Sequence, residues 1–209
     1  MEQNRIHVLH VLSMLYITLS IVCNPLFFRY LEFYDFRISC SALVYPLVYV
    51  LLDTMTALSD RKTVIVIIVA GRICDGLFSI LLFSFANSQI PLNMSDIAIQ
   101  NTNAVNTIGN LVWPLWYHGA IAATVTAIAE ILLFAFLFKK INNFFLSTIA
   151  SIIIMLLTHN VITDYPLLKN DPQVWRIIFG NLSINISIMV LYAGLISILM
   201  KAKLIRLYK

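Results

Sequence analysis

Apolar residues fill six segments of the chain, and shorter polar stretches separate these segments. A helix needs about 20 apolar residues to cross the ~30 Å hydrocarbon core of a bilayer. The strict alternation of a membrane β-barrel is absent from the segments, and a helix satisfies its own backbone groups in lipid. The pattern therefore predicts an all-α bundle of six transmembrane helices, over residues 6–28, 40–59, 63–86, 113–138, 144–168 and 174–200.

The composition supports a membrane protein with one domain. Hydrophobic residues make up 60% of the 209 residues and charged residues only 11%, too few charges for the surface of a soluble domain. No polar segment is long enough to fold alone, so we expect a single domain over residues 1–209. The first apolar segment is followed by Cys23, Asn24 and Pro25 rather than by a small-residue cleavage site, so we expect an uncleaved span.

The basic residues lie mainly between the predicted spans and indicate orientation. Nine fall on the side that holds both predicted termini and four on the other side. The positive-inside rule therefore predicts cytoplasmic termini and an external connection over residues 87–112. This connection is rich in asparagine, and we expect either a partly ordered lid or a mobile loop. Because topology accounts for the positive charge, we expect no nucleic-acid partner.

Charged side chains inside a span cost free energy unless they are paired or face a cavity. Arg72 and Asp75 are three residues apart and can pair on one helix face. The pair either orients the bundle or leaves Arg72 to neutralise a carboxylate on another helix. The charged residues within the spans are Asp53, Arg72, Asp75, Glu130 and Asp164.

Two of these carboxyl groups have specific interpretations. Glu130 stands in mid-span without a polar neighbour on its own helix, so it pairs across the bundle, carries a proton or faces a cavity. Asp53 follows Tyr45 and Tyr49 at intervals of four residues, which keeps the three on one slowly drifting helix face. Two aromatic rings above a carboxylate can bind a flat ligand. The structural alternative is an interfacial tyrosine belt with a capped carboxylate.

Polar residues gather late in the fifth span and early in the sixth. His159, Asn160 and Asp164 form one cluster, and Asn185 lies on the sixth span. Such groups either join helices by hydrogen bonds or line a polar cavity, and we expect Asn160, Asp164 and Asn185 at a cavity. Trp116 belongs to an aromatic group that forms either an interfacial belt or the entrance.

Known enzyme signatures are missing from the sequence. It contains no G-x-S-x-G nucleophile motif, no H-E-x-x-H zinc motif and no phosphate loop. Cys23, Cys40 and Cys74 lack the spacing of a metal or redox site. We therefore expect a protein that is not an enzyme, without catalytic residues, cofactor or metal. A membrane-embedded enzyme or an assembly subunit remains an alternative.

Residues 41–53 carry a resemblance to a known family. They read Ser-Ala-Leu-Val-Tyr-Pro-Leu-Val-Tyr-Val-Leu-Leu-Asp, an aromatic-proline pair followed by an apolar run and an aspartate. This segment resembles the second span of the queuosine-precursor transporter family, six-span bacterial proteins also called vitamin uptake transporters. Asn24, the polar turn over residues 33–41 and the layout of the other spans agree, so the resemblance covers nearly the whole chain.

The resemblance implies a function and a set of site residues. It implies import of a 7-deazaguanine, such as preQ0, preQ1 or queuine, across the bacterial inner membrane with possible coupling to protons. A guanine-like ring needs aromatic stacking and carboxylate or amide partners. The expected substrate-binding residues are Tyr45, Tyr49, Asp53, Arg72, Asp75, Glu130, Asn160, Asp164 and Asn185.

The chain departs from the family pattern at several positions. Ala129 and Glu130 stand where the family usually has a Gly-Gln pair, and Leu133 stands where an aspartate usually follows. Asn185 replaces a basic residue that is frequent in the last span. These departures leave the exact substrate and the coupling ion open. The sequence also leaves open whether the chain is a monomer or a homodimer.

A second transport function stays open beside the first. The substrate-binding subunit of an energy-coupling-factor importer also has about six spans and binds a vitamin. Those subunits usually carry small residues at four-residue intervals on the first helix, where a partner docks. Residues 10–24 show no such pattern. Co-purification with an ATPase module would favour this alternative.

Overall fold

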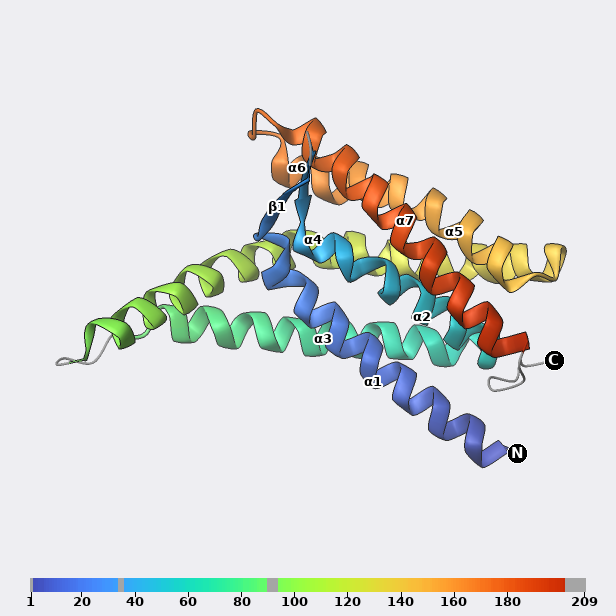
Figure 1. Ribbon diagram of the computed structural model, residues 1–209. Helices are drawn as coiled ribbons and strands as arrows, with labels where there is room; N and C mark the ends of the chain where they lie inside the picture. Colours follow the sequence, from blue (N-terminus) through green and yellow to red (C-terminus); the bar gives the residue numbers. More distant parts are fainter. Residues whose placement is uncertain (1, 34–35, 90–93, 202–209) are drawn as a thin grey trace.

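The computed structural model describes residues 2–33, 36–89 and 94–201 and shows a long helical bundle (Figure 1). Six described helices are long and apolar enough to cross a membrane, which confirms the six apolar helices that the sequence predicts. The helices are α1 (Glu2–Phe27), α2 (Tyr45–Leu58), α3 (Arg61–Ala86), α4 (Asp96–Ile141), α5 (Phe144–His159), α6 (Tyr165–Leu168) and α7 (Val174–Lys201).

Helix α2 lies at the centre of the bundle. It contacts α1, α3, α4, α5 and α7, and most of its residues are buried. Pro46 stands in its first turn, where a proline starts a helix without losing a hydrogen bond. Because neighbours cover α2 on nearly every side, a polar side chain in its middle contacts other helices rather than lipid.

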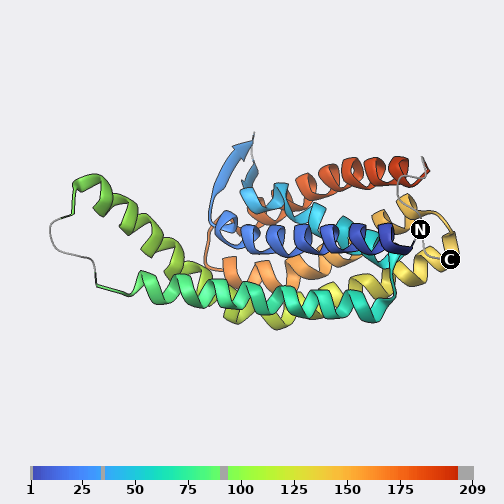
Figure 2. The same ribbon diagram turned by 90° about the horizontal axis from the view of Figure 1, so that it is seen from below.

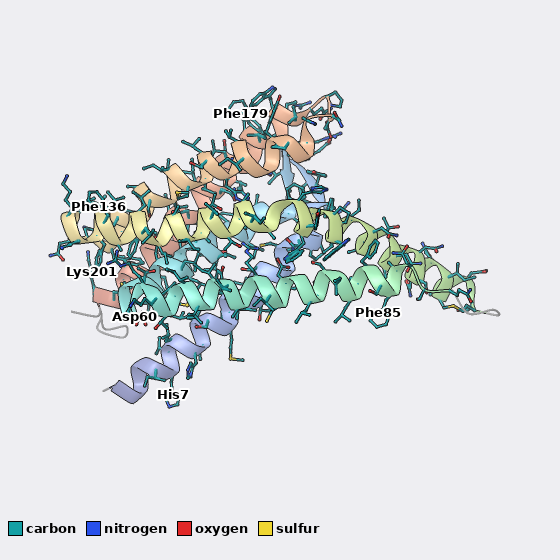
Figure 3. All side chains as sticks on the ribbon, turned by 180° about the vertical axis from the view of Figure 1, so that it is seen from behind. His7, Asp60, Phe85, Phe136, Phe179 and Lys201 are labelled. Carbon is teal, nitrogen blue, oxygen red and sulfur yellow. The ribbon has the colours of Figure 1, made fainter. Side chains whose placement is uncertain are left out.

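Apolar side chains cover the outer surface of the bundle. Ile121 is 79% exposed and Val66 is 66% exposed. Figure 3 shows Phe85, Phe136 and Phe179 pointing outward from three different helices, and each is more than half exposed. A soluble monomer rarely exposes apolar surface on this scale, so the surface fits a hydrocarbon environment.

The prediction of a lid or loop over residues 87–112 is wrong for most of its length. Helix α4 begins at Asp96, capped by the Ser95 hydroxyl, and continues to Ile141 without interruption. Its first turns and the end of α3 form a helical hairpin that extends beyond the rest of the bundle (Figures 1 and 2). We call this part the protruding hairpin. The asparagines have low helix propensity, but contact with α3 supports the helix.

Gly109 allows the two helices of the protruding hairpin to pack closely. A Cβ atom at this position would lie 2.6 Å from the carbonyl oxygen of Leu82 and 2.7 Å from the Cβ atom of Ala86. The Asn87 amide also donates a hydrogen bond of 3.1 Å to Asn110. Any residue larger than glycine at this position would therefore push the helices apart.

A β-hairpin replaces the polar turn that the sequence predicts over residues 33–41. Strands β1 (Tyr30–Phe33) and β2 (Phe36–Ser39) are antiparallel, and a short 3₁₀ helix, η1 (Cys40–Leu43), follows them. The Ser39 N–H donates a hydrogen bond of 2.8 Å to the Asn181 side chain. A Cβ atom at Gly180 would lie 2.7 Å from the Arg37 carbonyl oxygen. The β-hairpin therefore rests on the first turns of α7.

The described ends of the chain lie at one end of the bundle (Figures 1 and 2). Figure 3 places Asp60 and Lys201 at this end. Asp60 precedes α3 and accepts hydrogen bonds from the Thr63 N–H and hydroxyl, and these bonds lower the pKa of the Asp60 carboxyl group. The β-hairpin lies at the opposite end, which we call the far end.

The arrangement gives a test of the predicted orientation. In a variant without the native cysteines, Asn101→Cys is expected to react with a membrane-impermeant maleimide added outside cells. Lys139→Cys, near the other end of α4, should react only after the membrane is permeabilised. The physical reason is the excess of basic residues on the side of the termini. The reverse labelling pattern would show that the termini are external.

Candidate functional site

A polar cavity of about 90 Å³ opens among the helices near the far end of the bundle. A buried water needs roughly 10–15 Å³ on the same scale, so the space suits several waters or a small flat molecule. All six spans contribute to the wall. The side chains in it are Ser20, Cys23, Asn24, Phe27, Ser41, Ala42, Tyr45, Arg72, Asp75, Leu115, Trp116, Ala120, Ala123, His159, Asn160, Asn181 and Asn185.

An ion pair forms one side of the cavity. The Arg72 guanidinium donates to the Asp75 carboxylate, with 3.3 Å between Nη1 and Oδ2. Asn24 of α1 donates from its amide to the other oxygen of Asp75. The Asp75 side chain is only 1% exposed and that of Arg72 17% exposed. Arg72 therefore pairs within its own helix, one of the two arrangements that the sequence allowed.

Aromatic side chains form a second side. The Tyr45 and Tyr49 rings meet edge to face, with centroids 5.1 Å apart, and the Tyr45 ring lies 5.2 Å from the His159 ring. The Tyr45 hydroxyl is 3.4 Å from Nε2 of His159. Tyr45 and His159 face the cavity, whereas Tyr49 lies behind them and is not in the wall.

Amide side chains form a third side. Asn160 and Asn185 are buried and line the cavity together with Asn181. The Asn160 Nδ2 and the Asn185 Oδ1 have no hydrogen-bond partner in the described part of the chain. Buried polar atoms of this kind are rare in folded proteins. They give the cavity one free donor and one free acceptor.

A π-helical segment positions Asn160. The segment η2 (Asn160–Asp164) follows α5 directly and continues into α6. Such segments are rare and occur frequently at functional sites. The described residues here include the backbone of Asp164 but not its side chain, so the predicted role of Asp164 lies outside the described part.

Asp53 and Glu130 do not line this cavity. Both side chains are 0% exposed and lie together in the centre of the bundle, on α2 and α4. The hydroxyl of Ser151 lies beside both carboxyl groups. None of the four carboxyl oxygens has a hydrogen bond of regular geometry to a described residue. The structure thus divides the predicted site residues into a cavity group and a separate carboxyl pair.

Trp116 separates the cavity from an apolar groove on the surface of the bundle. The groove, of about 540 Å³, runs between α3 and α4, and Trp116, Arg72 and Ala120 belong to both its wall and that of the cavity. Gly76 accepts the indole closely, since a Cβ atom there would lie 2.6 Å from the ring. The sequence left two interpretations for the aromatic group that contains Trp116, an interfacial belt or an entrance. In the structure, Trp116 forms the wall between the cavity and the groove.

Several cavity residues were missing from the expected set. Asn24, His159 and Asn181 carried a visible signal, because each is a polar residue in or beside an apolar segment. Asn181 also holds the β-hairpin in place. Ser20 and Ser41 carried no usable signal, since serine is common on helices that face lipid or another helix.

Comparisons with known proteins add no relative. No family model, no curated protein and no solved structure matches this chain.

Proposed function

We propose that the chain is a membrane transporter that imports a 7-deazaguanine base across the bacterial inner membrane. The observation that carries the proposal is the polar cavity enclosed by six apolar helices, whose wall contains both the Tyr45 ring and free amide atoms of Asn160 and Asn185. Polar cavities are costly within a membrane protein and mark substrate pathways.

The chemistry of the wall matches the chemistry of the proposed substrate. A guanine-like edge offers N–H donors beside a carbonyl acceptor, and the cavity offers the Asp75 carboxylate beside the Arg72 guanidinium. The amides of Asn160 and Asn185 supply a further donor and acceptor. Tyr45 and His159 present ring faces or edges on which a flat ring can pack. The proposal gives these residues a binding role and no catalytic role.

Uptake of labelled preQ0, preQ1 and queuine tests the proposal. The cells lack their own synthesis of these compounds and their own transporter, and they express the chain. We expect accumulation of at least one compound in unchanged form. No accumulation of any of the three would overturn the substrate assignment, and chemical conversion in detergent would favour an enzyme.

Variants of the two asparagines connect uptake with the cavity. Asn160→Leu and Asn185→Leu keep the side-chain size and remove the polar atoms, so each should cost about 1–3 kcal/mol of binding free energy. This corresponds to an apparent affinity that is roughly 5-fold to 150-fold weaker. Asn101→Leu, on the exposed part of α4, is the matched control and should transport like the parent. Equal loss in all three variants would argue against the cavity as the site.

A further inference from the structure

The carboxyl pair of Asp53 and Glu130 is unusual because it is fully enclosed. Both residues are 0% exposed, as is Thr148 beside Asp53. The Thr148 hydroxyl, like the four carboxyl oxygens, has no hydrogen-bond partner of regular geometry in the described chain. The Ser151 hydroxyl also faces both carboxyl groups. Five buried oxygen atoms without such a partner therefore meet at the junction of α2, α4 and α5.

Two negative charges cannot both persist at this junction. Placing like charges together in a low-dielectric interior is strongly unfavourable. The Arg72 guanidinium is bound to Asp75, so its charge is already paired outside this junction. The Thr148 hydroxyl, which has no other described partner, can stabilise one carboxylate as a donor, whereas the Ser151 hydroxyl donates to the Thr148 carbonyl oxygen at 3.1 Å. Paired carboxyl groups elsewhere resolve the same conflict by holding one proton between them.

A chain of hydroxyl and ring groups connects the pair with the cavity. Tyr49 stands one helical turn before Asp53 on α2, and its hydroxyl donates to the Tyr45 hydroxyl at 3.5 Å. The Tyr45 hydroxyl is in turn 3.4 Å from Nε2 of His159. Tyr45 and His159 line the cavity, while Tyr49 is only 2% exposed. Each group in the chain both accepts and donates a proton.

We propose that Asp53 and Glu130 share one proton and exchange a second one with the cavity through Tyr49, Tyr45 and His159. In the outward direction a pair that carries two protons gives the second one to the Tyr49 oxygen and keeps the shared one. Tyr49 passes its own proton to Tyr45, and Tyr45 passes its own to Nε2 of His159. His159 then releases a proton to the cavity, so both tyrosines end neutral and no charge remains on the path. Rotation of the two hydroxyls allows the reverse direction.

The other described groups around the carboxyl pair offer no second path to the cavity. Arg72 of α3 interacts electrostatically with Tyr49 and with Tyr16 of α1. The fully buried α7 residues of the same core, Met189 and Ala193, are apolar and cannot carry a proton. On α5, Thr148 and Ser151 offer hydroxyls beside the pair, but neither lines the cavity. The tyrosine pair is thus the described polar connection between the carboxyl groups and the cavity.

The shared proton gives the proposed transporter a means of coupling. A substrate in the cavity that contacts Tyr45 or His159 would change the free energy of proton transfer along the path. By reciprocity, loading of the carboxyl pair would change substrate affinity by the same factor. This coupling step rests on the proposed function, but the shared proton and its path do not.

Infrared spectroscopy of the purified full chain in lipid nanodiscs tests the pair without any substrate. A protonated buried carboxyl group gives a separate C=O stretching band, which shifts in D₂O. We expect this band at neutral pH in the parent and its loss in Asp53→Asn/Glu130→Gln. Asp60→Asn, which removes an exposed carboxyl group and keeps a helix-capping residue, should leave the band unchanged. Absence of the band in the parent, or its persistence in the double variant, would overturn the shared proton.

A kinetic version of the same measurement tests the path. Tyr49→Phe keeps the ring and the carboxyl pair, so the band should remain. The rate at which the C=O band shifts after transfer to D₂O should fall by about tenfold or more, because a positioned proton-transfer group is removed. Tyr192→Phe, on the surface of α7 that packs against the core, is the matched control and should exchange like the parent. An unchanged rate in Tyr49→Phe would exclude the tyrosine path, and removal of the band by added Na⁺ would identify a metal-ion site instead.

Discussion

Asp75→Ala is expected to destabilise the protein by about 3–5 kcal/mol, because it leaves the Arg72 guanidinium without its partner among the helices. The substitution also removes the acceptor of the Asn24 amide. In a detergent solution, thermal unfolding should occur roughly 10 °C lower than in the parent. Asp75→Asn keeps the shape and an acceptor for Asn24, so it should lie between the parent and Asp75→Ala.

Glu32→Ala supplies the control for this prediction. It removes the other described ion pair, in which Glu32 lies 3.5 Å from Arg37 on the β-hairpin, and the Glu32 side chain is 76% exposed. An exposed pair contributes about 0–1 kcal/mol, so the unfolding temperature should hardly change. Equal effects of the two alanine substitutions would show that the Arg72–Asp75 pair does not hold the bundle together.

Replacement of the carboxyl pair by apolar residues is expected to raise stability and abolish proton coupling. Asp53→Leu/Glu130→Met fills the enclosed space with side chains of similar size and removes groups without hydrogen bonds. Replacement of buried ionic groups by well-packed apolar groups commonly stabilises a protein by about 1–4 kcal/mol. Thermal unfolding of the purified variant should therefore shift upward.

The same double variant separates structural and functional roles of the pair. Accumulation of substrate driven by a pH gradient should be lost, while exchange of substrate across the membrane should remain. Glu130→Gln alone should give the same separation with a smaller change in stability. A double variant that unfolds at a lower temperature than the parent would mean that the carboxyl groups are needed for folding.

The six spans were predictable because one physical requirement dominates them. Lipid demands about 20 apolar residues for each crossing, and that signal survives errors at the helix ends. Helix α4 shows where the signal stops: residues 96–112 are helical although their asparagines favour loops. The support comes from α3 and from Gly109, where only glycine permits the approach. Contacts between distant residues of this kind leave no mark in local composition.

The residue types of the candidate site were predictable from the sequence. Their division into a cavity group and a separate carboxyl pair was not. The sequence selected Asp53, Arg72 and Glu130 because each is costly within a span, and Tyr45 because its ring lies on the same helix face as Asp53. It could not show that Arg72 faces the cavity while Asp53 and Glu130 are enclosed. That distinction depends on how α2, α4 and α5 rotate against one another, and a helix rotated by one position would exchange the two environments.

The protruding hairpin has a practical consequence for imaging. A helix of 46 residues is roughly 70 Å long, more than twice the ~30 Å thickness of the hydrocarbon core of a bilayer. The close contact at Gly109 should keep this extension in a fixed direction relative to the bundle. An antibody fragment bound to it would stand clear of the detergent micelle or nanodisc. A chain of only 209 residues is too small for particle alignment alone in electron cryomicroscopy. The protruding hairpin would provide a rigid attachment point for an antibody fragment that aids this alignment.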